Sequence, residues 1–172
     1  MKNKEYGSDF DYPIKNKFLL DANQHSLFST ENFALFFSGR AVLYNILKNG
    51  IENNNWKKVY VPSFYCHEVI HFIKPLSIEI QYYEFNPFLD SEEKELNIDD
   101  SILNVIVNVD FFGIKKLNLS NYQNIIQIDD VTHHIVGYET SKADFCFGSL
   151  RKELPIPVGG FCTSPKSKIL PQ

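Results

Sequence analysis

Short apolar runs recur along the chain, and polar turns or helical patterns separate them. The runs that we interpret as strands are residues 59–61, 78–85, 105–109, 125–128, 144–147 and 160–163. Apolar residues with helical spacing follow Ser38 as far as Asn49-Gly50, and a second helix is expected over 66–73. Strands that alternate with helices or long connections predict an α/β fold, with a mostly parallel central sheet and flanking helices.

The chain is long enough for one hydrophobic core. It has 172 residues, of which 44% are hydrophobic, so one domain is expected. Residues 1–32 combine charged residues, glycine and proline without a sustained period. They predict an irregular leader in front of a domain that occupies residues 33–172.

Net charge and cysteine content restrict the partners and the compartment. A formal charge of −4 gives no general attraction to nucleic acid or to anionic membranes. The start of the chain is polar, and no segment approaches the apolar length of a membrane span. Cys66, Cys146 and Cys162 are odd in number and far apart, which is typical of reduced thiols. We expect a cytoplasmic protein without nucleic-acid or membrane partners.

Polar side chains follow two of the expected strands at the end where parallel sheets bind their ligands. Asp130 comes shortly after the run 125–128, and Ser149 and Lys152 follow a later strand. A lysine amine can bond to the aldehyde of pyridoxal phosphate, an aspartate can keep its pyridine nitrogen protonated, and a serine can reach its phosphate. Alone, Lys152 is interpreted as a surface lysine and Asp130 as a helix cap. Asp129 is expected on the opposite side of the strand from Asp130.

The segment Ser38-Gly39-Arg40-Ala41 opens the first expected helix. Free backbone N–H groups and the helix dipole attract anions there, and Gly39 lets a phosphate approach closely. A simple cap by Ser38 is the alternative. The order of this segment, the carboxylate, the serine and the lysine along the chain is the order that one cofactor requires, and it favours pyridoxal phosphate.

Short segments also match a known family: SGRAVL at 38–43, VPSFYC at 61–66, VDFFG at 109–113 and DDVTH at 129–133. Together with Lys152 they make residues 35–164 resemble the N-terminal part of the sugar aminotransferases of the DegT/DnrJ/EryC1/StrS family, fold type I of the pyridoxal-phosphate enzymes. The resemblance implies the large domain of that fold. Members of the family are much longer, so we expect a truncated domain.

The resemblance implies roles for single residues. It implies cofactor binding by Gly39, Arg40, Ala41, Cys66, Asp130, His133 and Ser149. Lys152 matches the catalytic lysine, Asp130 the contact of the pyridine nitrogen, and His133 a nearby polar contact. Cys66 takes the position that covers the cofactor ring, where most members have an aromatic residue. Asp110 stands where the family often has a histidine.

The implied reaction is a two-stage transfer of an amino group. An amino acid, expected to be glutamate, loads the cofactor, and a keto-sugar nucleotide then receives the amine. Products of this kind feed bacterial polysaccharide or antibiotic sugars. The resemblance further implies a homodimer, or a complementing C-terminal half that supplies the rest of the enzyme.

A rival motif is the HExxH string His67-Glu68-Val69-Ile70-His71. On a helix it would place two imidazoles on one face for zinc, with Glu68 as general base and Glu79 or Glu84 as a third ligand. Its helix is short, and the glycine of the extended metalloprotease signature is missing. A zinc metallopeptidase therefore stays an alternative, as does a non-catalytic remnant of an aminotransferase, and we predict no metal site.

Overall fold

The computed structural model describes residues 32–88 and 96–171. Their elements are, in chain order, β1 (Phe33–Phe36), α1 (Gly39–Asn54), β2 (Lys58–Pro62), α2 (His67–Ile73), β3 (Glu79–Tyr83), β4 (Asn104–Val109), β5 (Ile126–Asp130), η2 (Ile135–Thr140), β6 (Phe145–Ser149), η3 (Leu150–Lys152) and β7 (Gly160–Thr163). The elements η2 and η3 are 3-10 helices.

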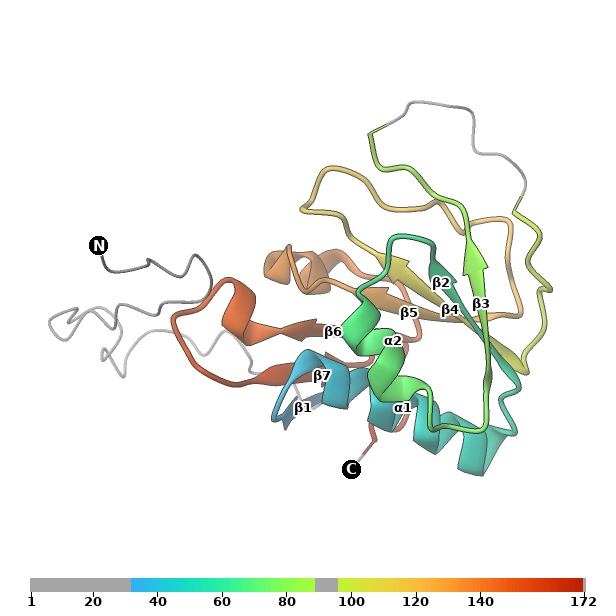
Figure 1. Ribbon diagram of the computed structural model, residues 1–172, viewed down its shortest axis with the longest axis horizontal. Coiled ribbons are helices and arrows are strands. Elements are labelled where there is room, and N and C mark those ends of the chain that lie inside the picture. The colour runs from blue at the N-terminus through green and yellow to red at the C-terminus, as the bar shows by residue number, and fades with distance from the viewer. Residues whose placement is uncertain (1–31, 89–95, 172) are drawn as a thin grey trace, which may run out of the picture.

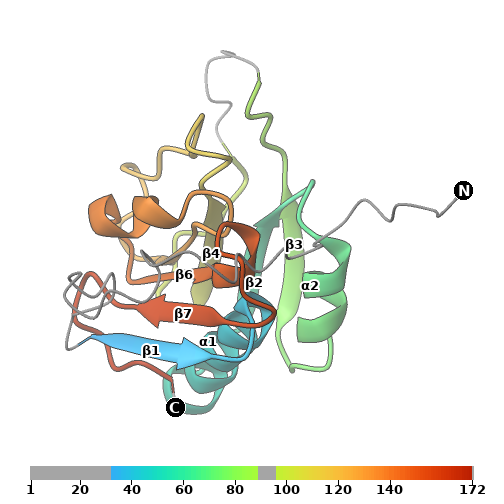
Figure 2. The same ribbon diagram turned by 90° about the vertical axis from the view of Figure 1, so that its left-hand side faces the viewer.

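A seven-stranded sheet forms the centre of the fold, in the order β1-β7-β6-β5-β4-β2-β3 (Figures 1 and 2). Strands β6, β5, β4, β2 and β3 are parallel to one another, whereas β7 is antiparallel to both β6 and β1. Parallel strands end at the same edge of a sheet. The ends of β2, β5 and β6 therefore lie together, and the expected α/β class with a mostly parallel sheet is confirmed.

The two faces of the sheet are covered differently. Strand β4 is buried at every residue, as in sheets that are covered on both sides. On one face, α1 and α2 contribute to the main core, in which Leu43 and Leu47 cluster with Val107. On the other face, irregular connections provide the cover, and Leu117 clusters there with Ile106. Of the described residues, only one face therefore has flanking α-helices.

Helix α1 begins where the sequence predicted and ends later. The Oγ of Ser38 accepts a hydrogen bond from the Ala41 N–H at 3.3 Å, which confirms the N-cap. The predicted helix end at Gly50 is wrong, because the helix continues to Asn54. A Cβ at Gly50 would lie 1.9 Å from the Trp56 ring, so a glycine is needed there for packing. The helix ends at Asn54, and the C-cap residue Asn55 has a left-handed φ of 56°. Within the described ranges, no helix has the length and apolar character needed to cross a membrane.

Strand β1 is an element that the sequence did not reveal. Among the described strands it pairs with β7 alone, in antiparallel register from Phe33 opposite Thr163 to Phe36 opposite Gly160. Its four residues do not alternate between buried and exposed positions, because Phe33, Ala34 and Phe36 are half-buried and Leu35 is exposed. The expected irregular leader, residues 1–32, lies outside the described residues except for residue 32.

Candidate active site

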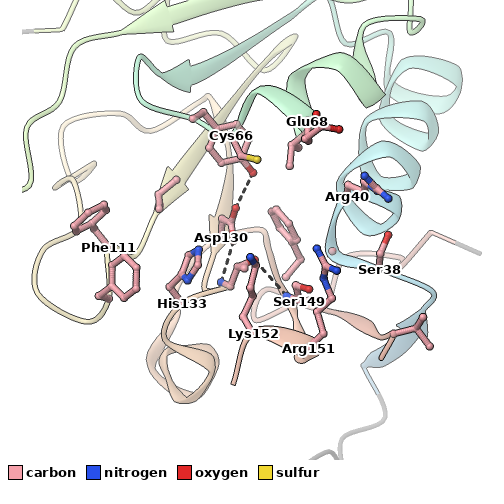
Figure 3. Close-up of a pocket in the computed structure, with 18 of the residues that line it drawn as sticks. Ser38, Arg40, Cys66, Glu68, Phe111, Asp130, His133, Ser149, Arg151 and Lys152 are labelled. Carbon is pink, nitrogen blue, oxygen red and sulfur yellow. Dashed lines mark hydrogen bonds between the residues drawn. The ribbon is translucent and has the colours of Figure 1, made fainter. Parts of the chain in front are cut away.

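A cavity of about 490 Å³ opens at the carboxyl ends of β2, β5 and β6, beside the first turn of α1 (Figure 3). Most of the residues that the sequence singled out line it: Gly39, Arg40, Cys66, Asp130, His133, Ser149 and Lys152. Ala41 is outside this lining, and its N–H is used in the cap of α1. The fold thus brings segments from across the chain to one cavity, as expected for an open parallel sheet.

Asp130 ends β5 and is 7% exposed. The Tyr65 hydroxyl donates a hydrogen bond to its Oδ2 at 2.6 Å, and the Thr132 N–H donates to its Oδ1 at 3.0 Å. Burial raises the pKa of Asp130, although the hydrogen bonds from Thr132 and Tyr65 lower it. This role of Tyr65 was not predicted from the sequence, because the contact joins residues far apart in the chain.

The donors to Asp130 are neutral groups. No Lys, Arg or His nitrogen in residues 32–88 and 96–171 forms an ion pair with this carboxylate. A buried carboxylate normally has a cationic partner, because desolvating an uncompensated charge is costly. Asp130 is therefore suited to a ligand that brings a positive charge into the cavity.

Lys152 and Asp130 act on the same imidazole. Burial lowers the pKa of His133, the Asp130 charge raises it, and the Lys152 charge lowers it further. Lys152 ends η3, and its side chain extends into the cavity that Asp130 faces (Figure 3). Asp130 and Lys152, which the sequence analysis assigned to one cofactor, therefore both lie close enough to His133 to shift its pKa.

Close backbone approach joins the start of α1 to the end of β6. A Cβ on Gly39 would lie 3.0 Å from the Cβ of Ser149. A Cβ on Gly160 would lie 2.4 Å from the carbonyl carbon of Ser38, and Ser38 also forms a bridge with Gly159. Glycine is therefore needed at position 160. This close approach brings Ser38 and Ser149 to the same side of the cavity (Figure 3).

Asp110, where a histidine was expected from the family pattern, has a histidine partner of its own. Its Oδ2 lies 2.8 Å from Nδ1 of His134, and its Oδ1 accepts the Gly113 N–H at 3.1 Å. These contacts hold the turn after β4. The adjacent His133-His134 pair was a visible signal, but only the fold assigns one ring to Asp110 and the other to the cavity.

The HExxH string does not build a metal site from the described residues. It occupies the first five residues of the seven-residue helix α2, and both His67 and His71 are exposed. Glu68 lines the cavity. Neither this helix nor any other part of the described ranges contains a group of three or more His, Cys, Asp or Glu that could hold a metal ion.

No protein-family model matches the sequence, and no curated protein matches it either. Solved structures do match. A DegT DnrJ EryC1 StrS aminotransferase from Brucella abortus covers 80% of this chain at 16% identity, with a TM-score of 0.55. An aromatic amino acid aminotransferase from Psychrobacter sp. B6 covers 78% at 12% identity, with a TM-score of 0.56. The sugar aminotransferase CalS13 from Micromonospora echinospora covers 78% at 16% identity, with a TM-score of 0.51. This chain has their fold.

These neighbours are fold type I pyridoxal-phosphate enzymes, so the fold inferred from the sequence is confirmed. At such identities the likeness concerns the fold and leaves family membership open. The chain spans about two fifths of the solved enzymes, since the alignments cover 42% of each of the three neighbours.

Proposed function

We propose that this chain is the cofactor-binding part of a pyridoxal-phosphate-dependent aminotransferase. The observation that carries the proposal is Asp130, a buried carboxylate without a cationic partner in the described residues, in the same cavity as Lys152. Bound pyridoxal phosphate would supply a protonated ring nitrogen and an electron sink. Asp130 would hold that nitrogen, and the amine of Lys152 would hold the cofactor covalently.

The other wall of the cavity suits a phosphate. Ser38, Gly39 and Ser149 line it, and the helix dipole at the start of α1 favours an anion. Arg40 adds positive charge at the same end. Lys152 Nζ would take a proton from the substrate carbon and return it, which is the general acid–base step of this class.

We further propose that glutamate is the amino donor and a keto-sugar nucleotide the acceptor, in the biosynthesis of surface polysaccharide. The sequence resemblance supports this choice, and two of the three structural neighbours are named as sugar-type or DegT-type aminotransferases. A second copy, or a complementing C-terminal half, would complete the enzyme. Three cysteines without a disulfide support the cytoplasm as the compartment.

The direct test is an absorbance titration of the purified protein with pyridoxal phosphate. We expect the yellow band of a lysine-bound cofactor, its loss on reduction with borohydride, and a reduced adduct on Lys152 in peptide mass spectra. Lys152→Ala should abolish the band. Lys142→Ala, at an exposed lysine outside the cavity, is the matched control. An adduct spread over several surface lysines would contradict the proposal.

A second readout needs no cofactor chemistry. Cys66 is exposed and lines the cavity, whereas Cys146 and Cys162 are buried. Burial raises the pKa of Cys162 to about 12 and also raises that of Cys146, so a thiol reagent should label Cys66 alone in the folded protein. Pyridoxal phosphate should slow this labelling. Equal labelling rates with and without the cofactor would place its binding elsewhere.

A further inference from the structure

We propose that an aromatic wall of this cavity, formed by Phe64, Phe111, Phe112 and His133, binds a planar aromatic or heteroaromatic ring of the substrate. The proposal rests on the proposed function, because its occupant is a molecule that reaches Lys152. All four side chains line the cavity that contains Lys152. The cofactor contacts above assign no role to Phe64, Phe111 and Phe112, and His133 is the one member of the wall that was also expected to contact the cofactor.

The rings of the wall are arranged as a continuous surface. Phe112 stacks on His133 with ring centroids 4.5 Å apart and planes 30° apart. Phe111 meets Phe112 edge to face at 5.0 Å and Phe64 at 5.6 Å. Phe112 is 55% exposed and Phe64 is 39% exposed, so ring surface is left open at the cavity. Aromatic rings attract one another in these geometries, and a ligand ring that covers the wall would displace water from the exposed ring surface.

The wall is held in place before any ligand arrives. Phe112 has a φ of 53°, in the left-handed region that bulky residues rarely adopt. The turn around it is fixed by the Gly113 N–H on Asp110 and by His134 on the same carboxylate. A rigid ring surface loses little conformational entropy on binding.

The opposite side of the cavity is polar and cationic. Arg151, which the proposed phosphate contacts do not use, lies across the cavity from Phe111 and His133 (Figure 3). The arrangement selects a ligand with an anionic group at one end and a planar ring at the other. Because burial and the nearby Lys152 charge lower the pKa of His133, against the effect of Asp130, its ring stacks as a neutral imidazole near neutral pH.

The experiment is an NMR titration of the protein, with and without pyridoxal phosphate, against two matched pairs of probes. Phenylacetate is compared with cyclohexylacetate, and uridine monophosphate with ribose 5-phosphate. We expect the planar member of at least one pair to bind more tightly by about threefold to tenfold. Phe112→Ala and Phe112→Leu should remove that preference. Phe88→Ala is the control, since Phe88 is exposed and packs on Phe111 at 5.2 Å without lining the cavity.

The pair that shows the preference identifies the source of the ring, a benzene-type side chain or a nucleobase. Equal binding of planar and non-planar probes, or an unchanged preference in both Phe112 variants, would overturn the aromatic wall. Binding of pyridoxal phosphate without any preference contradicts the wall alone. A ring preference in a protein that does not bind pyridoxal phosphate contradicts the proposed function and supports the wall as a ring-binding surface.

Discussion

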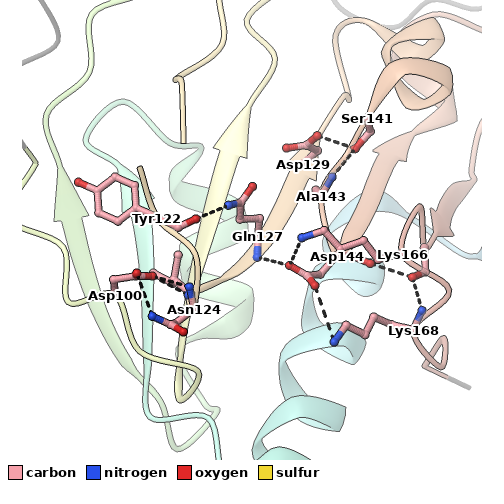
Figure 4. Close-up of polar contacts among 12 residues, drawn as sticks. Asp100, Tyr122, Asn124, Gln127, Asp129, Ser141, Ala143, Asp144, Lys166 and Lys168 are labelled. Atoms are coloured by element: carbon pink, nitrogen blue, oxygen red, sulfur yellow. Dashed lines mark hydrogen bonds and ion pairs between the residues drawn. The ribbon is translucent and has the colours of Figure 1, made fainter. Parts of the chain in front are cut away.

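Two adjacent aspartates on β5 have opposite surroundings. Asp129 is 2% exposed and forms an ion pair with Lys116. It also accepts a hydrogen bond from Ser141 at 2.6 Å (Figure 4). Asp130 is almost as buried, but its hydrogen-bond donors are the neutral groups of Tyr65 and Thr132. Strand geometry turns the two side chains to opposite faces, as the sequence predicted.

A third buried aspartate follows the pattern of Asp129. Asp144 accepts the Gln127 N–H at 3.0 Å, and Lys166 and Lys168 lie 3.2 and 3.8 Å from its carboxylate oxygens (Figure 4). The two buried aspartates away from the cavity, Asp129 and Asp144, thus have lysine partners, whereas the buried one that faces the cavity has none in the described residues. The comparison indicates that Asp129 and Asp144 stabilise the fold, and that the charge of Asp130 is available to a ligand.

The largest effect on stability should come from removing the cationic partner of Asp129, so that its carboxylate is buried without a lysine, like that of Asp130. Lys116→Met leaves the Asp129 carboxylate buried without its cation, so we expect the free energy of unfolding to fall by about 3 kcal/mol. Urea denaturation measures this change, with Lys142→Met as a control at an exposed lysine. If stability falls by less than about 1 kcal/mol, as for an ordinary surface ion pair, then Asp129 does not depend on a cationic partner.

The next effect concerns the ligand. Asp130→Asn removes the negative charge while keeping the shape of the side chain, so the affinity for pyridoxal phosphate should fall by roughly tenfold to a hundredfold. Asp129→Asn, the same change one residue away, is the matched control and should leave the affinity unchanged. Absorbance titrations give both dissociation constants. Equal losses in the two variants would contradict a specific role of Asp130.

Asp130→Asn should also stabilise the protein without ligand, by about 1 kcal/mol near neutral pH. Burial raises the pKa of Asp130 in the folded protein, so the folded state binds the proton more tightly than the unfolded chain. The stability linked to this proton is complete below the ordinary pKa of 3.8 and is lost as the pH rises toward the raised value. The advantage of the variant should therefore grow from acid to neutral pH, which denaturation curves at several pH values would show. A constant difference would contradict this explanation.

The smallest effects belong to the exposed partners of Asp144. The side chains of Lys166 and Lys168 are 48% and 47% exposed, so each ion pair is partly screened by solvent. Lys166→Ala and Lys168→Ala should each reduce stability by less than about 1 kcal/mol. The double variant should lose more than the sum of the two, because each lysine compensates for the absence of the other. Thermal unfolding of the three variants measures this non-additivity.

The sequence was informative where a local pattern carries the signal. Asp130, Ser149 and Lys152 follow short apolar runs, and Ser38-Gly39 precedes a helical period, so strand-end and cap positions could be assigned without coordinates. These same positions line the cavity. Local patterns therefore predicted the class of fold and the residues to consider.

The remaining features depend on contacts between distant residues. Tyr65 and Asp130 are 65 positions apart, and the Asp110–His134 pair joins two separate turns. Strand β1 exists only through its pairing with β7. No spacing rule connects such residues, so the sequence could name Asp130 but could not show that neutral donors surround it.

In this interpretation, the charge of Asp130 is available to a cationic group of the ligand. Its most direct test is the titration of the Asp130 carboxyl carbon by NMR, assigned with Asp130→Asn, in the presence and absence of pyridoxal phosphate. We predict that the bound cofactor lowers the pKa of Asp130, because a protonated ring nitrogen stabilises the carboxylate. A pKa that stays unchanged or rises when pyridoxal phosphate is bound would show that Asp130 does not contact a cationic group of the cofactor.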